Sequence, residues 1–175
     1  MPDVASKSLG LESGIVRLVE YDERWPALFA AESGLLRDVC KSLPLKIEHI
    51  GSTSVPGLCA KPVLDILAGY PAHASPLDYV APLTSAGYEH RGENGIPGRQ
   101  FFRRGRPRAY HLHLVALDSR LWNEHIAFRD RLRADARLAR EYADLKRALA
   151  ARFPRDRESY ITGKSAFVAK VLSGA

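Results

Sequence analysis

The sequence predicts one α+β domain in which helices cover a mixed β-sheet. Three observations support this fold class. The chain has 175 residues, a length that suits one domain. Short strand-like runs alternate with helical segments over its first two thirds, whereas the last third carries only helical patterns. Hydrophobic residues make up 46% and charged residues 26% of the chain, which excludes a disordered protein.

The N-terminal segment is expected to lead into the first helix. Residues 1–13 are polar and predict a flexible tail. Residues 15–19 alternate in polarity and predict a short strand. Asp22 is the candidate N-cap of a helix that has Pro26 in its first turn and ends before Pro44.

Two strand patterns with a tight turn between them follow this helix. Residues 46–50 form the first, and the two-residue period places His49 on the face opposite to its sequence neighbours. Residues 51–57 are rich in Gly, Ser, Thr and Pro and predict a turn. Residues 62–70 are apolar on both faces, which indicates a central strand, and Asp65 interrupts this apolar run.

Further patterns complete the sheet and its helical cover. A helix that begins at residue 75 or 76 is expected to end at Gly87. Strands are expected at residues 88–91, 100–104 and 109–117. Apolar residues at helical spacing then predict three helices, at residues 121–132, 138–149 and 158–172.

The composition also bears on cellular location. The apolar run at residues 63–70 is short and broken by Asp65, so no membrane-spanning helix is expected. Residues 1–10 lack the apolar stretch of a secretory signal. Cys40 and Cys59 stand alone, without the spacing of a metal site. We therefore expect a cytoplasmic protein that does not contact membranes, of undetermined oligomeric state.

The positive charge is concentrated in one stretch. Lys and Arg total 26 against 20 Asp and Glu, a net charge of +6. Five arginines fall close together, at Arg99, Arg103, Arg104, Arg106 and Arg108. Such clusters attract phosphate on a nucleotide, a metabolite or nucleic acid, although a solvated hairpin explains the pattern equally well. Aromatic residues are not interleaved as base stacking requires, so nucleic-acid binding is only weakly indicated.

The strongest candidate site combines a turn with the carboxylate of the next strand. The turn consists of Gly51, Ser52, Thr53 and Ser54. Its backbone N–H groups can hold phosphate oxygens, and Asp65 can hold a Mg²⁺ ion that bridges phosphates. Lys61 lies between them in the sequence and can reach phosphate as a point charge. The structural alternative is a Ser/Thr-rich turn capped by a buried aspartate.

Three histidines form a second candidate site. His111 and His113 are two residues apart in one strand, so both rings point to the same face. If Asp65 shares that face, these residues with His49 could bind Zn²⁺ or another transition metal in place of Mg²⁺. A histidine can also act as a general base. A lone histidine is more often structural.

Two lysines follow a tyrosine at helical spacing. Tyr142 precedes Lys146 and Tyr160 precedes Lys164 by four residues, so each pair shares a helix face. The lysine either extends past a packed ring or carries its charge to a phosphate. The spacing alone favours the packing role.

Several blocks of the sequence resemble the GrpB family. The longest covers residues 47–58 and continues at residues 61–66, so it includes the Gly51 turn and Asp65. Later blocks at residues 111–115, 128–133, 142–146 and 160–167 agree with the family pattern. The resemblance runs from residue 15 to residue 172. The same domain occurs fused to some bacterial dephospho-CoA kinases.

The resemblance implies a nucleotidyltransferase-like fold, with a mixed β-sheet flanked by helices and a C-terminal helical part. It implies that Gly51 and Ser52 form a phosphate loop and that Asp65 is a metal carboxylate, with Mg²⁺ or Mn²⁺ as cofactor. The active superfamily pattern has a second acid where this chain has Leu67, and the later strand offers His111 and His113 where a third acid is expected. The sequence thus departs from the usual two-metal arrangement.

The leading hypothesis is a metal-dependent, nucleotidyltransferase-like protein that acts on a nucleotide and a small acceptor. Its catalytic residues would be Asp65, His49 and His113, and its metal ligands Asp65, His111 and His113. Its phosphate-binding residues would be Gly51, Ser52, Thr53, Ser54, Lys61, Lys146 and Lys164. The alternatives are a non-catalytic nucleotide- or CoA-binding module and a Zn²⁺-dependent hydrolase that uses His49, His111 and His113.

Overall fold

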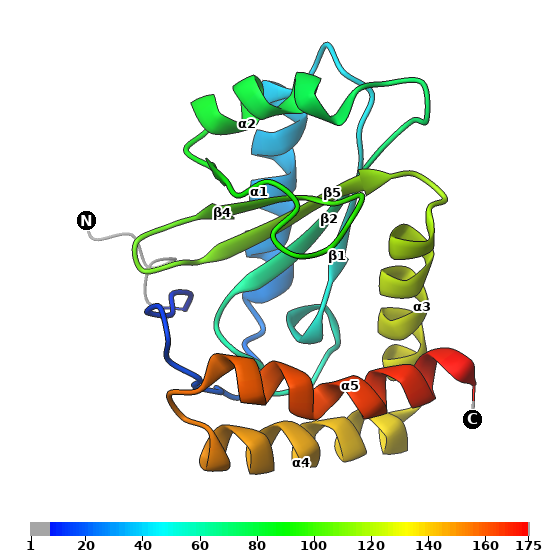
Figure 1. Cartoon of the computed structure of the whole chain (residues 1–175). Helices are drawn as coiled ribbons and strands as arrows, with labels where there is room; N and C mark the ends of the chain where they lie inside the picture. Colours follow the sequence, from blue (N-terminus) through cyan, green and yellow to red (C-terminus); the bar gives the residue numbers. More distant parts are fainter. Residues whose placement is uncertain (1–7, 175) are drawn as a thin grey trace.

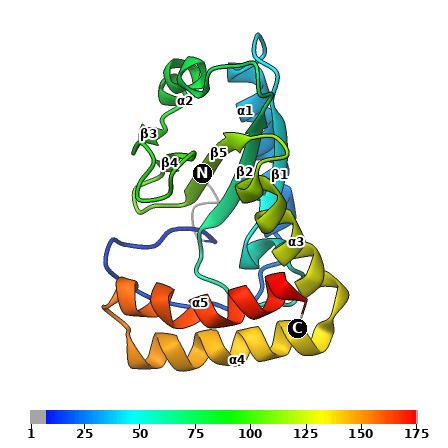
Figure 2. The ribbon, with the colours of Figure 1, turned by 45° about the vertical axis from the view of Figure 1, so that its right-hand side comes forward.

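A computed structural model describes residues 8–174 and confirms the α+β class. Figure 1 shows a central sheet with α1 (Trp25–Val39) and α2 (Val80–Ser85) on one side. Figure 2 shows α4 (Ala136–Arg152) and α5 (Arg157–Ser173) side by side below the sheet, with α3 (Arg120–Ala134) descending to them. No helix of residues 8–174 combines the length and apolar character that crossing a membrane requires.

The sheet is mixed, as predicted. Its strands are β1 (Lys46–Ile50), β2 (Leu64–Tyr70), β3 (Glu89–His90), β4 (Gln100–Arg104) and β5 (Tyr110–Ala116). They lie in the order β1-β2-β5-β4-β3, in which β2 and β5 are parallel and the other neighbours antiparallel. The apolar β2 is therefore an inner strand, as its composition indicates.

The two faces of the sheet differ in polarity. Ile66 of β2 and Leu112 of β5 belong to a core that α1 and α2 cover. On the opposite face, Leu67 packs with Trp122 of α3. Asp65 of β2 pairs with His111 of β5, and both lie on that second face. The sheet thus carries Asp65 and His111 on the face opposite to the core that α1 and α2 cover.

Local capping explains why the three C-terminal helices begin where they do. Ser119 accepts a hydrogen bond from the Trp122 N–H at the start of α3. Asp135 and Asp156 cap α4 and α5 in the same way. Each cap satisfies backbone donors that the first turn of a helix leaves free. These caps hold α4 and α5 at fixed starting points beneath the polar end of the sheet.

The N-terminal predictions need correction. Residues 1–7 lie outside the described residues, but residues 8–13 are not a loose tail, because Leu11 is fully buried and bridges Arg108. Residues 15–19 form no strand, and Val19 alone makes a bridge, to Ala60. This segment passes the residues that precede β2 as an extended connection, not as a sixth strand.

Two helix boundaries also differ from the predictions. The N-cap of α1 is Arg24, not Asp22. Asp22 instead accepts the Arg24 N–H at 2.9 Å, a turn that ends before the helix. The helix expected from residue 75 is split into a 3₁₀ turn, η3 (Pro76–Tyr79), followed by α2. The helix α2 ends at Ser85, and Gly87, with φ of 88°, follows its C-cap Ala86, as predicted for a glycine after a helix.

Candidate functional site

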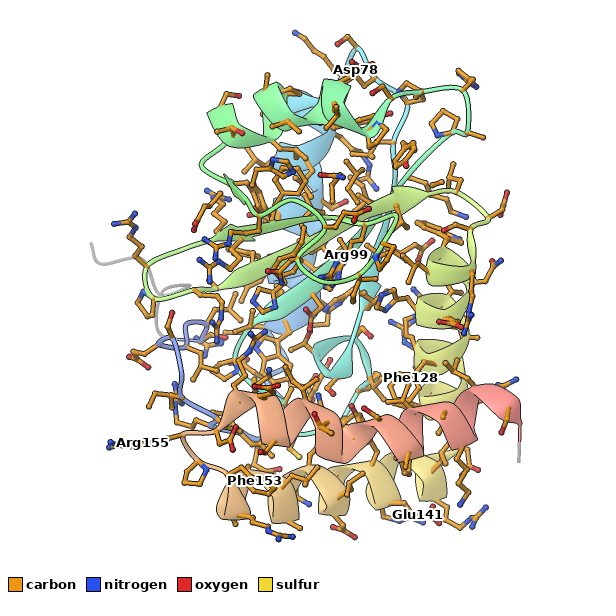
Figure 3. The ribbon with its side chains drawn as sticks, in the orientation of Figure 1. Asp78, Arg99, Phe128, Glu141, Phe153 and Arg155 are labelled. Carbon is orange, nitrogen blue, oxygen red and sulfur yellow. The ribbon has the colours of Figure 1, made fainter. Side chains whose placement is uncertain are left out.

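A pocket lies between the polar end of the sheet and the α4–α5 pair. Its volume is about 470 Å³, and its walls come from segments far apart in the sequence. The turn η2 (Ser52–Ser54) and β2 form one wall, while α4 and α5 form the other. Figure 3 shows Arg99 on the loop beside the sheet and Phe128 on α3 above α5, and both residues contribute to the lining.

Gly51 lets the turn approach the carboxylate of Asp65. Its φ is 72°, a backbone conformation that favours glycine, and a Cβ there would lie 2.8 Å from Asp65 Oδ2. The hydroxyl of Ser54 donates to the Gly51 carbonyl at 2.6 Å and closes the turn. Glycine is thus required both by conformation and by space, which places the turn directly against Asp65.

Asp65 is held between two histidines. Its Oδ1 lies 3.3 Å from His111 Nδ1 and 3.3 Å from His113 Nε2. Burial acts to raise the pKa of Asp65, but the hydrogen bonds from His111 and His113 outweigh it and hold that pKa well below its usual value. Asp65 is therefore a carboxylate at neutral pH, and 33% of its side chain remains exposed.

Arg99 connects this cluster to the loop that precedes β4. Its Nη1 lies 3.3 Å from His113 Nδ1, and its Nη2 donates to the Glu93 and Asn94 carbonyls at 3.2 Å and 3.0 Å. Its guanidinium stacks 4.7 Å from the centre of the Phe101 ring. Arg99 is thus fixed in the pocket wall.

The other arginines of the basic stretch lie elsewhere. Arg103, Arg104, Arg106 and Arg108 line a separate surface hollow. Arg103 pairs with Glu89 at 3.1 Å, and Arg104 pairs with Glu32 at 2.7 Å. The structure therefore divides the basic stretch, and Arg99 is its member in the pocket.

Three lysines converge on the pocket, one from the segment that precedes β2 and two from the last two helices. Lys146 is 1% exposed, and its Nζ donates to Ser52 Oγ at 2.8 Å and to the Cys59 carbonyl. Lys61 and Lys164 lie over the Tyr160 ring, 5.4 Å and 4.6 Å from its centre. Both Tyr-x-x-x-Lys pairs therefore bring their lysine to the pocket.

The environment of these lysines disfavours their charge. Burial lowers the pKa of Lys146 to about 7. Burial and repulsion by Lys164 lower the pKa of Lys61 to about 8. Burial also lowers the pKa of Lys164. Lysine pKa values lowered in this way are typical of cations clustered in a binding site for an anion.

Two predicted site residues do not line the pocket. His49 lies opposite Ile66 in the register of β1 and β2, on the face of the sheet that α1 covers. Its ring stacks on Phe29 with 4.6 Å between centres, and its Nε2 lies 2.9 Å from Thr53 Oγ1. Strand alternation thus separates His49 from Asp65. The Ser54 hydroxyl is directed to the Gly51 carbonyl rather than to the pocket.

Sequence reasoning missed Arg157, which lines the pocket at the first turn of α5. The sequence does indicate a role for this residue. A cation at a helix N-terminus interacts unfavourably with the helix dipole, so an arginine in the first turn suggests a function other than helix stability. Asn94, Phe128 and Ile161 were missed as well. Their types and spacing carry no mark of a site.

The donor set does not fit two magnesium ions held by paired acids. The expected second acid is Leu67, which is fully buried against Ile50 and Trp122. Within residues 8–174, no group of three or more His, Cys, Asp and Glu side chains is placed to hold a metal ion. Asp65, His111 and His113 form a hydrogen-bonded cluster.

Solved structures show where this fold recurs. GrpB from Enterococcus faecalis superposes with a TM-score of 0.83 and 35% identity, covering 90% of this chain and 96% of that one. The Cid1 poly(U) polymerase with Mg 3′-dATP bound superposes with a TM-score of 0.54 over 76% of this chain and 43% of that one. At 15% identity, the Cid1 match shows the fold alone, which is nucleotidyltransferase-like as the resemblance implied.

Sequence relatives agree. A UPF0157 protein of Pseudomonas aeruginosa is 42% identical over 91% of this chain and 67% of its own length. A dephospho-CoA kinase of Mycolicibacterium paratuberculosis is 29% identical over 85% of this chain, which spans 43% of that protein. The family model described as GrpB protein matches residues 15–173. The chain belongs to the GrpB family.

Proposed function

We propose that this chain binds the phosphate groups of a nucleotide in the pocket between β2 and the α4–α5 pair. One observation carries the proposal: Lys61, Lys146 and Lys164 converge there, yet none of them hydrogen bonds to a carboxylate within the described chain. Clustered cations without acidic partners are favourable when an anion joins them.

The turn adds a second element of recognition. Gly51, Ser52 and Thr53 line the pocket. Because residue 51 has no side chain, its backbone can lie close to Asp65. Backbone N–H groups in such turns and cationic side chains are the partners that phosphate oxygens prefer. Tyr142 and Tyr160, whose rings also line the pocket, offer flat surfaces to the rest of a ligand.

A small nucleotide suits the site better than a nucleic acid. Two of the five arginines that first indicated nucleic acid are paired with acids, since Arg103 pairs with Glu89 and Arg104 pairs with Glu32. The nucleic-acid hypothesis therefore rests on fold similarity, such as that to a Cid1 structure in complex with its product ApU. The enclosed lysines, in contrast, define a site of nucleotide size.

Group transfer is the second candidate function, and Asp65 favours it. The ionised carboxylate of Asp65 can accept a hydrogen bond from an acceptor hydroxyl and orient it as it attacks phosphorus, displaces diphosphate and loses its proton to solvent. A Zn²⁺-dependent hydrolase has less support, because His49 lies on the other face of the sheet.

Calorimetric titration with ATP, GTP, UTP, CoA and inorganic tripolyphosphate tests the proposal. We expect binding, and we expect Lys164→Gln to weaken it by about tenfold or more, because a hydrogen bond to a charged group contributes about 1.5–3 kcal/mol. Lys170→Gln, an exposed position on the same helix, is the matched control. Absence of binding by every ligand, or equal losses in both variants, would refute a phosphate site here.

Product analysis separates the two candidate functions. If the bound nucleotide is converted in the presence of hydroxyl or amine acceptors and Asp65→Asn stops the reaction, the chain is a transferase. If the nucleotide is recovered unchanged after prolonged incubation while it still binds, the chain is a binding module.

A further inference from the structure

The charges that line the pocket are strongly unbalanced. Five cationic side chains contribute to its wall within residues 8–174, namely Lys61, Arg99, Lys146, Arg157 and Lys164. Asp65 is the one acidic side chain among the described lining residues. Even with Lys146 partly neutral, this set suits a ligand that brings several negative charges.

The cations also repel one another and hold unsatisfied donors. After burial, repulsion by Lys164 and Arg157 contributes to the low pKa of Lys61. The Nε atom of Arg157 is buried without a hydrogen-bond partner in the described chain, as are Nε and Nη2 of nearby Arg108. A buried donor without an acceptor is costly. A polyanion in the pocket would relieve the repulsion.

Asp65, in contrast, is poorly suited to magnesium. Mg²⁺ requires oxygen ligands in near-octahedral geometry. Oδ1 of Asp65 already contacts two imidazoles, and Oδ2 lies against Gly51. The neighbouring position that would supply a second carboxylate is Leu67. The field at Asp65 includes the charges of Lys61, Lys164 and Arg99, which oppose a second cation.

We propose that the pocket binds the polyphosphate group of its nucleotide free of divalent metal. This inference rests on the proposed function and specifies its ligand as the uncomplexed tri- or tetra-anion. Lysines and Arg157 then supply the positive charge that magnesium supplies in the Cid1 structures with bound Mg 3′-dATP and MgGTP. The inference follows from the side chains in the pocket. Several cations line it, and its one described carboxylate, Asp65, already contacts two histidines.

The wild-type protein provides the first test, by titration with inorganic tripolyphosphate and with ATP in EDTA and in excess MgCl₂. We expect binding in EDTA, and we expect it to be several-fold weaker with Mg²⁺, because complexation removes negative charge from the ligand. Binding that requires Mg²⁺ would overturn the metal-free inference and leave the proposed function standing. No binding under either condition would overturn both.

Asp65→Asn distinguishes metal-free binding from metal-bridged binding, because the two predict different changes in affinity. If the polyphosphate binds without metal, removing the acid removes a repulsion, so affinity in EDTA should hold or rise. If a metal bridges Asp65 to the phosphates, the variant should lose affinity in Mg²⁺. Thermal unfolding of the variant confirms that it is folded, and Lys170→Gln again controls for a change of one charge outside the pocket. A loss of affinity in EDTA would contradict the inference.

Discussion

A Cβ atom on residue 51 would lie 2.8 Å from Asp65 Oδ2, so the turn at Gly51 and the carboxylate of Asp65 can be this close because residue 51 is glycine. The backbone there also has φ of 72°. We predict that Gly51→Ala lowers the free energy of unfolding by about 1–3 kcal/mol, the cost of a strained backbone position. It should also weaken tripolyphosphate binding, because the turn and Asp65 must move apart.

Gly57→Ala is the control for this prediction. Gly57 has φ of 78° in the following loop, but a Cβ there would meet nothing within 4 Å. Urea denaturation should therefore show backbone strain in both variants, whereas calorimetry should show the loss of affinity in Gly51→Ala alone. Equal affinities in the two variants would mean that contact between the turn and Asp65 has no part in binding.

The core of the fold was predictable because it follows local rules. Burial determines the pattern of apolar residues in these elements. It is visible in the apolar run of β2, in the alternation of β5 and in the helical spacing of the three C-terminal helices. Besides two helix boundaries, the errors lie in residues 8–19, where one fully buried side chain, Leu11, orders a polar segment. Sequence alone does not show such a contact, because its partner Arg108 is distant in the chain.

The site was predictable where chemistry and strand period agree. Asp65 and His111 share a face because both follow the strand alternation, and Gly51 follows from the turn. The gathering of Lys61, Lys146 and Lys164 required tertiary structure, since it depends on how α4 and α5 cross beneath the sheet. Sequence spacing brings each lysine to a helix face or strand entry, but not to a common point.

Affinity for tripolyphosphate should depend on pH through the pocket lysines. The pKa of Lys146 is about 7 and that of Lys61 about 8, so both gain charge as pH falls from 9 to 6. Lys146 faces Lys61, Lys164 and Arg147, which repel its proton, and a bound anion reverses this repulsion. We predict tighter binding at pH 6 than at pH 9, with proton uptake, in calorimetry repeated in buffers of different ionisation enthalpy.

Lys146→Gln tests the assignment of that pH dependence. The variant should bind more weakly at pH 6 and should take up fewer protons, because one of the two lysines with a pKa of about 7 to 8 no longer titrates. Lys170→Gln should keep the wild-type profile. A profile in Lys146→Gln that parallels the wild type would remove Lys146 from the titration.

The stability of the ligand-free protein should change with pH in the opposite direction. The pKa of Lys146 is about 7 in the folded protein and 10.5 ordinarily, so the unfolded chain binds more protons between these values. Stability therefore rises with pH across this window, because the cost of removing the Lys146 proton on folding falls as the unfolded chain also loses that proton. We predict that Lys146→Met gains stability relative to wild type near pH 6, and that this relative gain shrinks near pH 9, in urea denaturation at both values.

His49 should prove to be a structural residue, because it lies on the face of the sheet away from Asp65. His49→Leu leaves the buried Thr53 hydroxyl without its partner, so we predict a loss of about 1–3 kcal/mol in the free energy of unfolding. Tripolyphosphate affinity should stay unchanged, whereas His113→Gln should alter it, because His113 contacts both Asp65 and Arg99.

The pH dependence of unfolding gives an independent check on His49. Burial lowers the pKa of His49 to about 4 from an ordinary 6.5, so the unfolded chain takes up the proton first as pH falls. Wild-type stability is therefore lost between pH 6.5 and pH 4, and His49→Leu should lose less over the same range. His125, whose pKa is also about 4, titrates in both proteins and cancels in the difference. Equal losses, or weaker phosphate binding in His49→Leu, would return His49 to the site.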